Sequence, residues 1–368
     1  MKQLAKLYKR DRKKKLLTWY VTFEEDGTLA TFSGEDGGKM KTTVTTSKPK
    51  NVGRSNETTH YTQAAADAQS KWNKQIDKGY CEDPDNIVEG TLPPLATNYK
   101  GNESKAEWPC YGLFKLDGVR STAFYRNGRV ELQTRGGKEY PGLKHTKAEL
   151  YDTFFEGSPD LVVDGELYCH GMHLEDIVSA AKKPNDNSPL LGFRVFDVYD
   201  PDEPDQLYRN RYLRYISEYY HGCVEPIEAR LLKNEAEMLA MHQEAVDAGY
   251  EGLIIRNLDR TFKFNLRTTD ILKYKVPLSS EFLVVGMEES KTGFGIPVCQ
   301  LTSNEGTVET FKAPFKASVE FKKAMLANKG EYIGQWLTVD FESYSKYGIP
   351  TKPIGKAYRG MINGEVQE

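Results

Sequence analysis

The chain has 368 residues, of which 39% are hydrophobic and 28% charged, with a formal net charge of −3. This length is enough for about two or three domains, and the composition is that of an ordinary globular protein. The small net charge excludes an overall basic field, although a local patch can still bind nucleic acid. The five cysteines are scattered and form no C-x-x-C pair, so we expect reduced thiols and neither a disulfide frame nor a zinc site.

No stretch is long and apolar enough to span a membrane, and the basic N-terminus lacks the apolar core of a signal peptide. These features predict an intracellular protein without a membrane partner.

Residues 1–80 are expected to form a small α+β domain. Strands are predicted at 16–23 and 28–32, on either side of an acidic turn that ends in Gly27. A helix is predicted at 61–78, with Gly79 as its C-terminal stop. The most basic run of the chain, residues 9–15, is typical of a solvated tail or of a contact with a phosphate backbone.

Residues 81–109 carry four prolines among Gly, Asn and Asp residues, which predicts an irregular linker. The main domain, residues 110–278, opens with an apolar run that ends at Lys115 and passes at once into Asp117-Gly118. A buried strand that ends in lysine is unusual, because an ammonium group is costly to bury, although a surface lysine before a turn would explain it equally well.

Asn127-Gly128 lies between two alternating runs, which is the strongest short signal for a hairpin. Two helices are predicted among the strands that follow, and the second has Asn234 and Glu237 as a capping pair and Gly249 as its stop. The predicted strands of this domain are 113–115, 121–125, 130–134, 161–168, 193–199, 252–256 and 271–276.

Residues 279–368 are expected to form a third domain of short alternating strands interrupted by one helix at 316–327. This pattern predicts a small Greek-key barrel of the OB type, a fold much used on nucleic acid. The predicted strands are 282–287, 298–302, 307–312 and 335–342.

Several charged residues stand on equally apolar strands of the main domain. Asp164 and Glu166 are two apart and so share one face of their strand, as do Lys273 and Lys275, while Glu251 begins another strand. Each one alone is more often an edge-strand charge than a catalyst. Together they supply cations and carboxylates that can bind a polyphosphate with its Mg²⁺ ions.

The same set suits a lysine that attacks phosphorus, because neighbouring cations favour the free amine that such an attack requires. No G-x-x-x-x-G-K-[ST] loop is present, which disfavours ordinary P-loop hydrolysis, and no G-x-G-x-x-G follows a strand, which argues against dinucleotide redox chemistry.

Residues 115–120 match K-x-D-G-x-R, the signature of the covalent nucleotidyltransferases. The chain most resembles the ATP-dependent DNA ligases of that superfamily, particularly compact viral and phage forms. The segments that resemble the later motifs, in order, are 134–137, 163–167, 193–197, 251–256 and 272–275.

This resemblance implies an α+β fold with an adenylation domain of antiparallel sheets and helices, an OB-fold β-barrel after it, and a small α+β domain before it. It implies ATP and Mg²⁺ as cofactors, with Mn²⁺ as a substitute, and nicked duplex DNA as the partner of a monomeric enzyme in replication, repair or recombination. The residue roles that it implies are adenylated nucleophile for Lys115, ribose binding for Arg120 and Glu166, metal binding for Glu166 and Glu251, adenine stacking for Phe196, contact with the nicked strand's phosphate for Arg135, and α-phosphate binding for Lys273 and Lys275.

The chain departs from the family at its last motif, which in many members is an Arg followed by an Asp-Lys pair. Here Gly360-Met361-Ile362 lacks the acid and the lysine, so Arg359 is expected to take over the orientation of pyrophosphate, with help from Lys356.

Three other functions are compatible with these motifs: an mRNA-capping guanylyltransferase, an RNA ligase, and an inactive homologue that only binds nucleic acid. Glu251 favours a ligase over a capping enzyme, which tends to carry Asp there, and Arg120 favours a DNA ligase over an RNA ligase. The structural alternatives for two site residues are core packing for Phe196 and a surface ion pair for Arg135.

Overall fold

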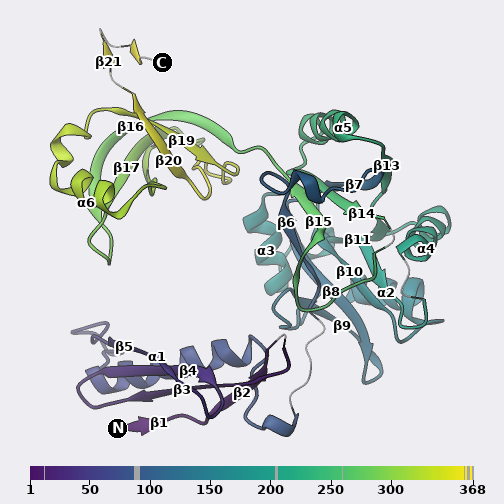
Figure 1. Cartoon of the computed structure of the whole chain (residues 1–368), viewed down its shortest axis with the longest axis horizontal. Coiled ribbons are helices and arrows are strands. Elements are labelled where there is room, and N and C mark those ends of the chain that lie inside the picture. The colour runs from purple at the N-terminus through teal and green to yellow at the C-terminus, as the bar shows by residue number, and fades with distance from the viewer. Residues whose placement is uncertain are drawn as a thin grey trace.

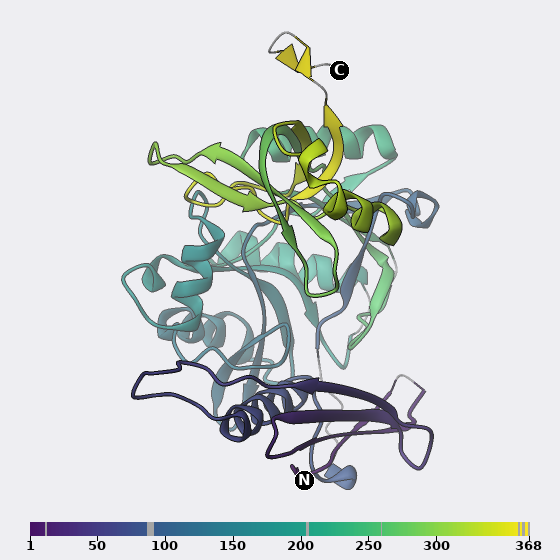
Figure 2. The same ribbon diagram turned by 90° about the vertical axis from the view of Figure 1, so that its left-hand side faces the viewer.

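The structure is a computed structural model, and it describes residues 1–11, 13–86, 92–203, 206–258, 260–359, 361–362 and 365–366. Arg12 of the basic run, Gly360 of the last motif and residues 87–91 of the predicted linker lie outside the described residues. Figure 1 shows an N-terminal, a middle and a C-terminal body, with the two smaller bodies on the same side of the middle one. Seen from that side, the C-terminal body lies above the N-terminal body, in front of the middle one (Figure 2).

The N-terminal body is a five-stranded antiparallel sheet with a helix on one face. The helix begins after Thr59, whose hydroxyl accepts a hydrogen bond from the Thr62 amide, and its Ala64 and Ala68 are fully buried with Trp19 and Val21 in one core. The two predicted strands and the helix are confirmed, and three further strands join them. The elements are β1 (Lys2–Gln3), β2 (Leu7–Arg10), β3 (Leu16–Phe23), β4 (Thr28–Glu35), β5 (Lys41–Thr46) and α1 (His60–Ile76).

The middle body contains two five-stranded sheets, ordered β12-β11-β10-β8-β9 and β13-β7-β14-β15-β6. Neighbouring strands are antiparallel except in the pairs β11–β12 and β15–β6. The predicted strands are all confirmed, with ends that differ by a few residues. The strands are β6 (Leu95–Asn98), β7 (Cys110–Lys115), β8 (Val119–Arg126), β9 (Arg129–Thr134), β10 (Val162–Tyr168), β11 (Gly192–Tyr199), β12 (Val224–Pro226), β13 (Arg230–Leu232), β14 (Gly252–Asn257) and β15 (Arg267–Tyr274).

The predicted hairpin between β8 and β9 is confirmed. Asn127 and Gly128 both have left-handed φ angles, of 54° and 72°, and the two strands pair on either side of them. A two-residue turn of this kind matches the twist of the strands that it joins.

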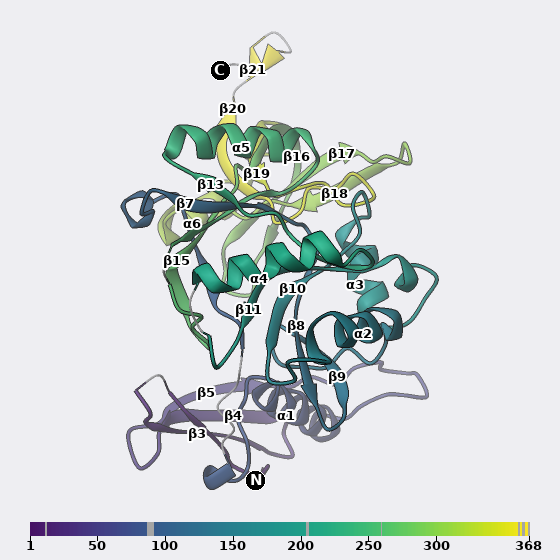
Figure 3. The same cartoon turned by 90° about the vertical axis from the view of Figure 1, so that its right-hand side faces the viewer.

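The prediction of two helices in the middle body is incomplete, because its described residues form four α-helices. They are α2 (Lys144–Leu150), α3 (Leu174–Lys182), α4 (Gln206–Tyr219) and α5 (Glu235–Asp247). The capping pair predicted for α5 is confirmed, since the Asn234 side chain accepts a hydrogen bond from the Glu237 amide at 3.0 Å. No side-chain cap bond marks the starts of α2 and α3, so the sequence carries little signal for them. Helix α4 lies on the face of this body that points away from the two smaller bodies (Figure 3).

The prediction that residues 81–109 are irregular throughout is wrong for β6. This strand pairs in parallel with β15, and the Thr97 hydroxyl donates to the Thr268 carbonyl at 2.8 Å. The pairing partner is about 170 residues further along the chain, so no local pattern announces it.

The C-terminal body is a five-stranded antiparallel sheet of order β18-β17-β16-β19-β20, with a helix between β18 and β19. A bridge between Phe315 and Gly355 connects the chain just after β18 to β20, which brings the two ends of the sheet together. The predicted strands and helix are confirmed, and β20 was not predicted. The elements are β16 (Leu278–Glu289), β17 (Gly295–Thr302), β18 (Val308–Lys312), α6 (Val319–Ala327), β19 (Trp336–Phe341) and β20 (Ile354–Arg359), followed by the separate pair β21 (Met361–Ile362) and β22 (Glu365–Val366).

Among the described residues, no helix is long and apolar enough to cross a membrane. All five cysteines are free thiols.

Candidate active site

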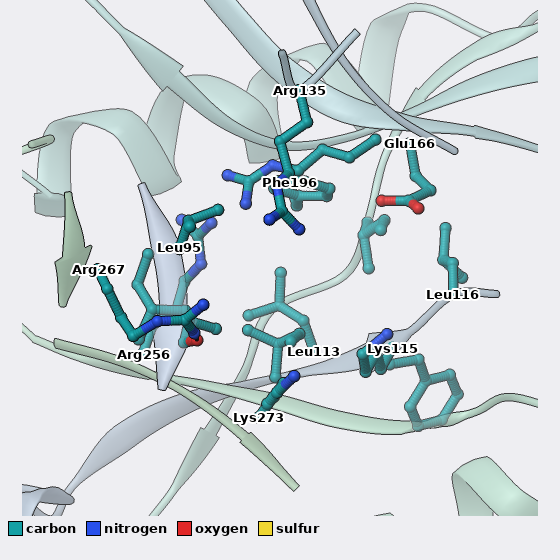
Figure 4. A pocket seen from close by; sticks show the side chains of 16 residues that line it. Leu95, Leu113, Lys115, Leu116, Arg135, Glu166, Phe196, Arg256, Arg267 and Lys273 are labelled. Atoms are coloured by element: carbon teal, nitrogen blue, oxygen red, sulfur yellow. Dashed lines mark hydrogen bonds between the residues drawn. The ribbon is translucent and has the colours of Figure 1, made fainter. Parts of the chain in front are cut away.

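A cavity of about 240 Å³ lies between the two sheets of the middle body, and Figure 4 shows the side chains around it. Its walls come from both sheets, including β6 and the ends of β7, β9 and β15. Six cationic side chains and one carboxylate line it, so its charge suits an anionic ligand. The charged lining residues are Lys115, Arg120, Arg135, Glu166, Arg256, Arg267 and Lys273.

Lys115 is the last residue of β7, and its side chain is only 21% exposed. Its backbone carbonyl accepts a hydrogen bond from the Glu251 amide at 2.9 Å, and its ammonium group is ion-paired with the Glu251 carboxylate. Lys115 thus lies at a charged site within the fold, close to Glu251 and to the lysines at the end of β15, while its role as a nucleophile stays a prediction.

Glu251 lies between two ammonium groups. Besides Lys115 it accepts a hydrogen bond from Lys275 at 2.7 Å. Burial raises the pKa of Glu251, but Lys115 and Lys275 outweigh burial, and the net result is a lowered pKa. The carboxylate is therefore held ionised.

Lys273 and Lys275, predicted as a pair, have different surroundings. Lys273 points into the cavity (Figure 4), and within the described part of the chain it makes no ion pair. Its pKa is lowered, first by burial and then by Lys275 and Lys115. Lys275 binds Glu251 and Glu342, and these carboxylates outweigh burial and raise its pKa.

Glu166 points into the cavity from β10 (Figure 4). Burial raises its pKa to about 8, and Asp164 and Glu251 add to that rise, while Lys115 and Arg120 oppose it. This raised pKa favours the protonated carboxyl group. A further cation, such as a phosphate-bound metal, would favour its ionised form.

Arg120 is fixed at the cavity wall by a buried carboxylate. Its Nε donates to Asp164 at 3.0 Å and its Nη2 at 2.5 Å, and its Nη1 donates to the Pro94 carbonyl at 2.6 Å. Asp164 is fully buried. The fork therefore leaves the guanidinium little freedom to move.

Phe196 lines the cavity and does not belong to the hydrophobic core, so core packing does not explain it. The Arg120 and Arg256 guanidinium carbons lie 5.1 and 5.6 Å from the centre of its ring. Arg135 follows β9, is exposed at the cavity, and has no ion pair among the described residues, so a surface ion pair does not explain it either.

Arg256 and Arg267 also line the cavity and were not predicted as site residues, and neither was Asp197, which binds Arg256. Asp197 is buried and accepts hydrogen bonds from Arg256 at 2.5 Å and Arg209 at 2.9 Å. Arg256 stands at the end of an apolar run, which is the same signal that singled out Lys115 and could have identified it.

Arg359 does not lie in the cavity. It is the last residue of β20, where its Nε donates to the Thr338 hydroxyl at 3.1 Å and lies 3.7 Å from Glu281. Lys356 is ion-paired with Asp340 at 3.0 Å in the same sheet. In this arrangement neither residue is placed at the cavity.

Gly118 is the motif residue whose small size the structure explains most directly. A Cβ at this position would lie 2.5 Å from the Leu167 carbonyl oxygen and 2.8 Å from Glu166 Cγ. Only glycine lets the turn after Lys115 approach the strand that carries Glu166 so closely.

No three His, Cys, Asp or Glu side chains of the described residues are grouped so that they could hold a metal ion by themselves. Glu251 nevertheless lies close enough to Glu166 for its negative charge to raise the pKa of Glu166. Mg²⁺ is usually held by one or two carboxylates together with substrate phosphates, and this donor set fits that arrangement.

The family model described as ATP dependent DNA ligase domain matches residues 93–275, which build the cavity. The DNA ligase of African swine fever virus (isolate Tick/Malawi/Lil 20-1/1983) is 28% identical over 355 residues, covering 90% of this chain and 83% of the viral protein. The DNA ligase of Enterobacteria phage T4 is 24% identical, covering 68% of this chain and 64% of the phage protein.

The solved structure named Pmar-Lig_Pre. superposes with a TM-score of 0.64 at 20% identity, covering 80% of this chain and 72% of that one, which shows a shared fold. The family model, the viral and phage relatives and the shared fold agree with one another. The chain belongs to the ATP-dependent DNA ligases.

Proposed function

We propose that this DNA ligase seals nicks in duplex DNA through a covalent bond between Lys115 and AMP. One observation carries the proposal: the Lys115 amine lies beside a cation-lined cavity, paired with Glu251 and near the ammonium of Lys273, which makes no ion pair among the described residues. A guanylyltransferase or an RNA ligase would use a similar lysine, but the family model and the relatives are those of DNA ligases.

In the first step, the lone pair of Lys115 Nζ attacks the α-phosphorus of ATP. A P–N bond forms, the bond from that phosphorus to the bridging oxygen breaks, pyrophosphate leaves, and the amine loses its proton. Only the free amine can attack, so the ammonium, which donates a hydrogen bond to Glu251, has to release a proton first.

In the second step, an oxygen of the DNA 5′-phosphate attacks the same phosphorus and the P–N bond breaks, which returns Lys115 to its free state. In the third step, the neighbouring 3′-hydroxyl attacks the DNA 5′-phosphorus and AMP leaves. Both are in-line displacements, for which positioning and charge neutralisation supply most of the rate enhancement.

The cavity supports the remaining roles. Phe196 would stack on adenine, since its ring lines the cavity. Glu166 and Arg120 would hold the ribose, and Lys273 with Lys275 the α-phosphate. Arg135, which is exposed at the cavity, would contact the phosphate of the nicked strand. Arg359 would orient pyrophosphate only if the C-terminal body moved from its present position.

Glu166 and Glu251 would hold Mg²⁺, for which Mn²⁺ could substitute. When bound, the metal would neutralise phosphate charge and ease the departure of pyrophosphate. This chain holds both carboxylates close to Lys115: Glu251 is ion-paired with it, and Glu166 is near enough for the Lys115 charge to act on its pKa.

The two smaller bodies, N-terminal and C-terminal, would contribute to DNA binding. The strand order of residues 279–368, with α6 between its third and fourth strands and the ends joined through Phe315 and Gly355, fits an OB-type barrel. Residues 1–80 would be an accessory DNA-contacting domain, joined by the lead-in 81–109 to the adenylation domain 110–278. We expect a monomer that acts inside a cell, where its DNA substrate lies.

The test is a duplex with one nick, labelled at its 5′-phosphate and incubated with ATP and Mg²⁺. Sealing by the unaltered protein, and none by Lys115→Ala, is the expected result. GTP in place of ATP, and a nick flanked by RNA, serve as controls for the capping enzyme and the RNA ligase. Binding of the nicked duplex without sealing would contradict the proposal and would indicate an inactive homologue.

A further inference from the structure

The C-terminal body contributes a carboxylate to the charged group around Lys115. Glu342, the residue after β19, lies 2.9 Å from the Lys275 ammonium, which in turn donates to Glu251 at 2.7 Å. The Lys275 and Glu342 side chains are 23% and 32% exposed, so water screens the pair only in part. A residue remote in sequence from the cavity thus contacts the residues that act there.

Glu342 is held in place by its own loop. Its amide donates to the Thr351 carbonyl at 3.0 Å, the Thr351 amide donates to the Ser343 carbonyl at 2.8 Å, and the hydroxyls of these two residues lie 2.8 Å apart. Lys352 is ion-paired with the same carboxylate at 2.5 Å. The carboxylate therefore bridges two ammonium groups from a fixed position.

Lys273 and Lys275 differ in their carboxylate partners, and the difference shows the effect of the Lys275–Glu342 contact. Lys273 faces the cavity and has no ion pair in the described part of the chain, so its ammonium is free for a phosphate. The Lys275 ammonium has three N–H groups, and two carboxylates already bind it. One N–H remains, so a phosphate oxygen has to share the ammonium with Glu342 and Glu251, which hold its position and offset its charge.

We propose that Glu342 is a positioning residue that sets the affinity for ATP, by holding Lys275 toward the C-terminal body and away from the nucleotide. This inference rests on the proposed function, in which Lys275 binds the α-phosphate. Removing the charge of Glu342 leaves Lys275 with one carboxylate and releases it toward the phosphate. The unaltered enzyme therefore binds ATP more weakly than it would if Lys275 were not held by Glu342.

The experiment measures self-adenylation of the full chain, as the rate of label transfer from α-labelled ATP over a range of ATP concentrations. The variants are Glu342→Gln, Lys275→Met and the two combined. Lys312→Met is the matched control, because the ion pair of Lys312 with Glu288, at 2.6 Å within the C-terminal sheet, involves neither the loop nor Lys275. Thermal unfolding of each variant verifies that it is folded.

Glu342→Gln should lower the KM for ATP by about threefold to fivefold, the range expected for a partly exposed ion pair. Lys275→Met should raise the KM by about tenfold or more, since it removes a charge-assisted contact with phosphate. In the Lys275→Met background, Glu342→Gln should change the KM by less than about twofold. Lys312→Met should leave the KM unchanged.

Two results would overturn the inference while the proposed function stands. One is normal labelling of Lys115 with an unchanged or raised KM in Glu342→Gln. The other is an equal fall in KM with and without Lys275, which would place the effect elsewhere, for example at Lys352. Absence of label from Lys115 in the unaltered protein would instead refute the proposed function, and the inference with it.

Discussion

Replacing Asp164 by Asn tests whether the buried fork that fixes Arg120 is a main support of the cavity. Asp164 is fully buried and accepts two hydrogen bonds from Arg120, whose side chain is 19% exposed. Removing one partner of a buried ion pair leaves the other charge uncompensated and costs about 3–5 kcal/mol. Burial raises the pKa of Asp164 despite the neighbouring Arg120, so we expect the lower end, about 3 kcal/mol.

The assay is urea unfolding of the full chain, followed by circular dichroism. Glu35→Gln is the matched control, because the Lys15–Glu35 pair has a similar 2.7 Å contact but is about half exposed, and its loss should change the free energy of unfolding far less than the loss of the buried pair. Adding Arg120→Met to Asp164→Asn should recover more than about 1 kcal/mol, because the unpaired charge is then gone. A cost for Asp164→Asn equal to that of the control, or no recovery in the double variant, would show that the buried fork is not a main support of the cavity.

Three further outcomes follow from the geometry of the cavity. Gly118→Ala should lower the free energy of unfolding by about 1–3 kcal/mol, because its Cβ would collide with the Leu167 carbonyl, whereas Gly157→Ala, which has open space, should change it by less than about 0.5 kcal/mol; equal urea midpoints for the two would contradict this. Phe196→Ala should raise the KM for ATP by about tenfold if the ring stacks on adenine, as measured by self-adenylation, and an unchanged KM would place adenine elsewhere. Burial raises the pKa of Glu166 from 4.5 to about 8, so its contribution to stability is full below pH 4.5 and is lost as the pH rises through about 8. Glu166→Gln should therefore gain stability relative to the unaltered protein between pH 6 and pH 9, and a difference independent of pH would show that the group is not buried in its acid form.

The site could be predicted largely from local sequence because its charged residues stand on apolar strands. Lys115, Glu166 and Lys273 are each a charged residue in an otherwise apolar run, where burial of a charge is unfavourable. The cavity brings all three together. Arg256 carries the same signal and was overlooked. The hairpin at Asn127 and the cap of α5 were likewise local, since turn and cap chemistry depends on neighbouring residues.

The remainder depends on contacts between distant segments. The segment at β6 looked irregular because of its prolines, and it becomes a strand only by pairing with β15. The contact between Glu342 and Lys275 joins the C-terminal body to the middle body, and no pattern in the sequence predicts that these two residues meet. The family pattern assigned Arg359 a role at the nucleotide, yet in the structure it pairs within its own sheet, because motif order does not specify where one body lies on another.

The most direct test of the central claim is the intact mass of the purified full chain after incubation with ATP and Mg²⁺, followed by mapping of the modified peptide. We expect a gain of one AMP, located on Lys115, and no gain in Lys115→Arg, which keeps the charge but not the nucleophile. AMP on another residue, or an unmodified protein that still seals nicks, would contradict this expectation.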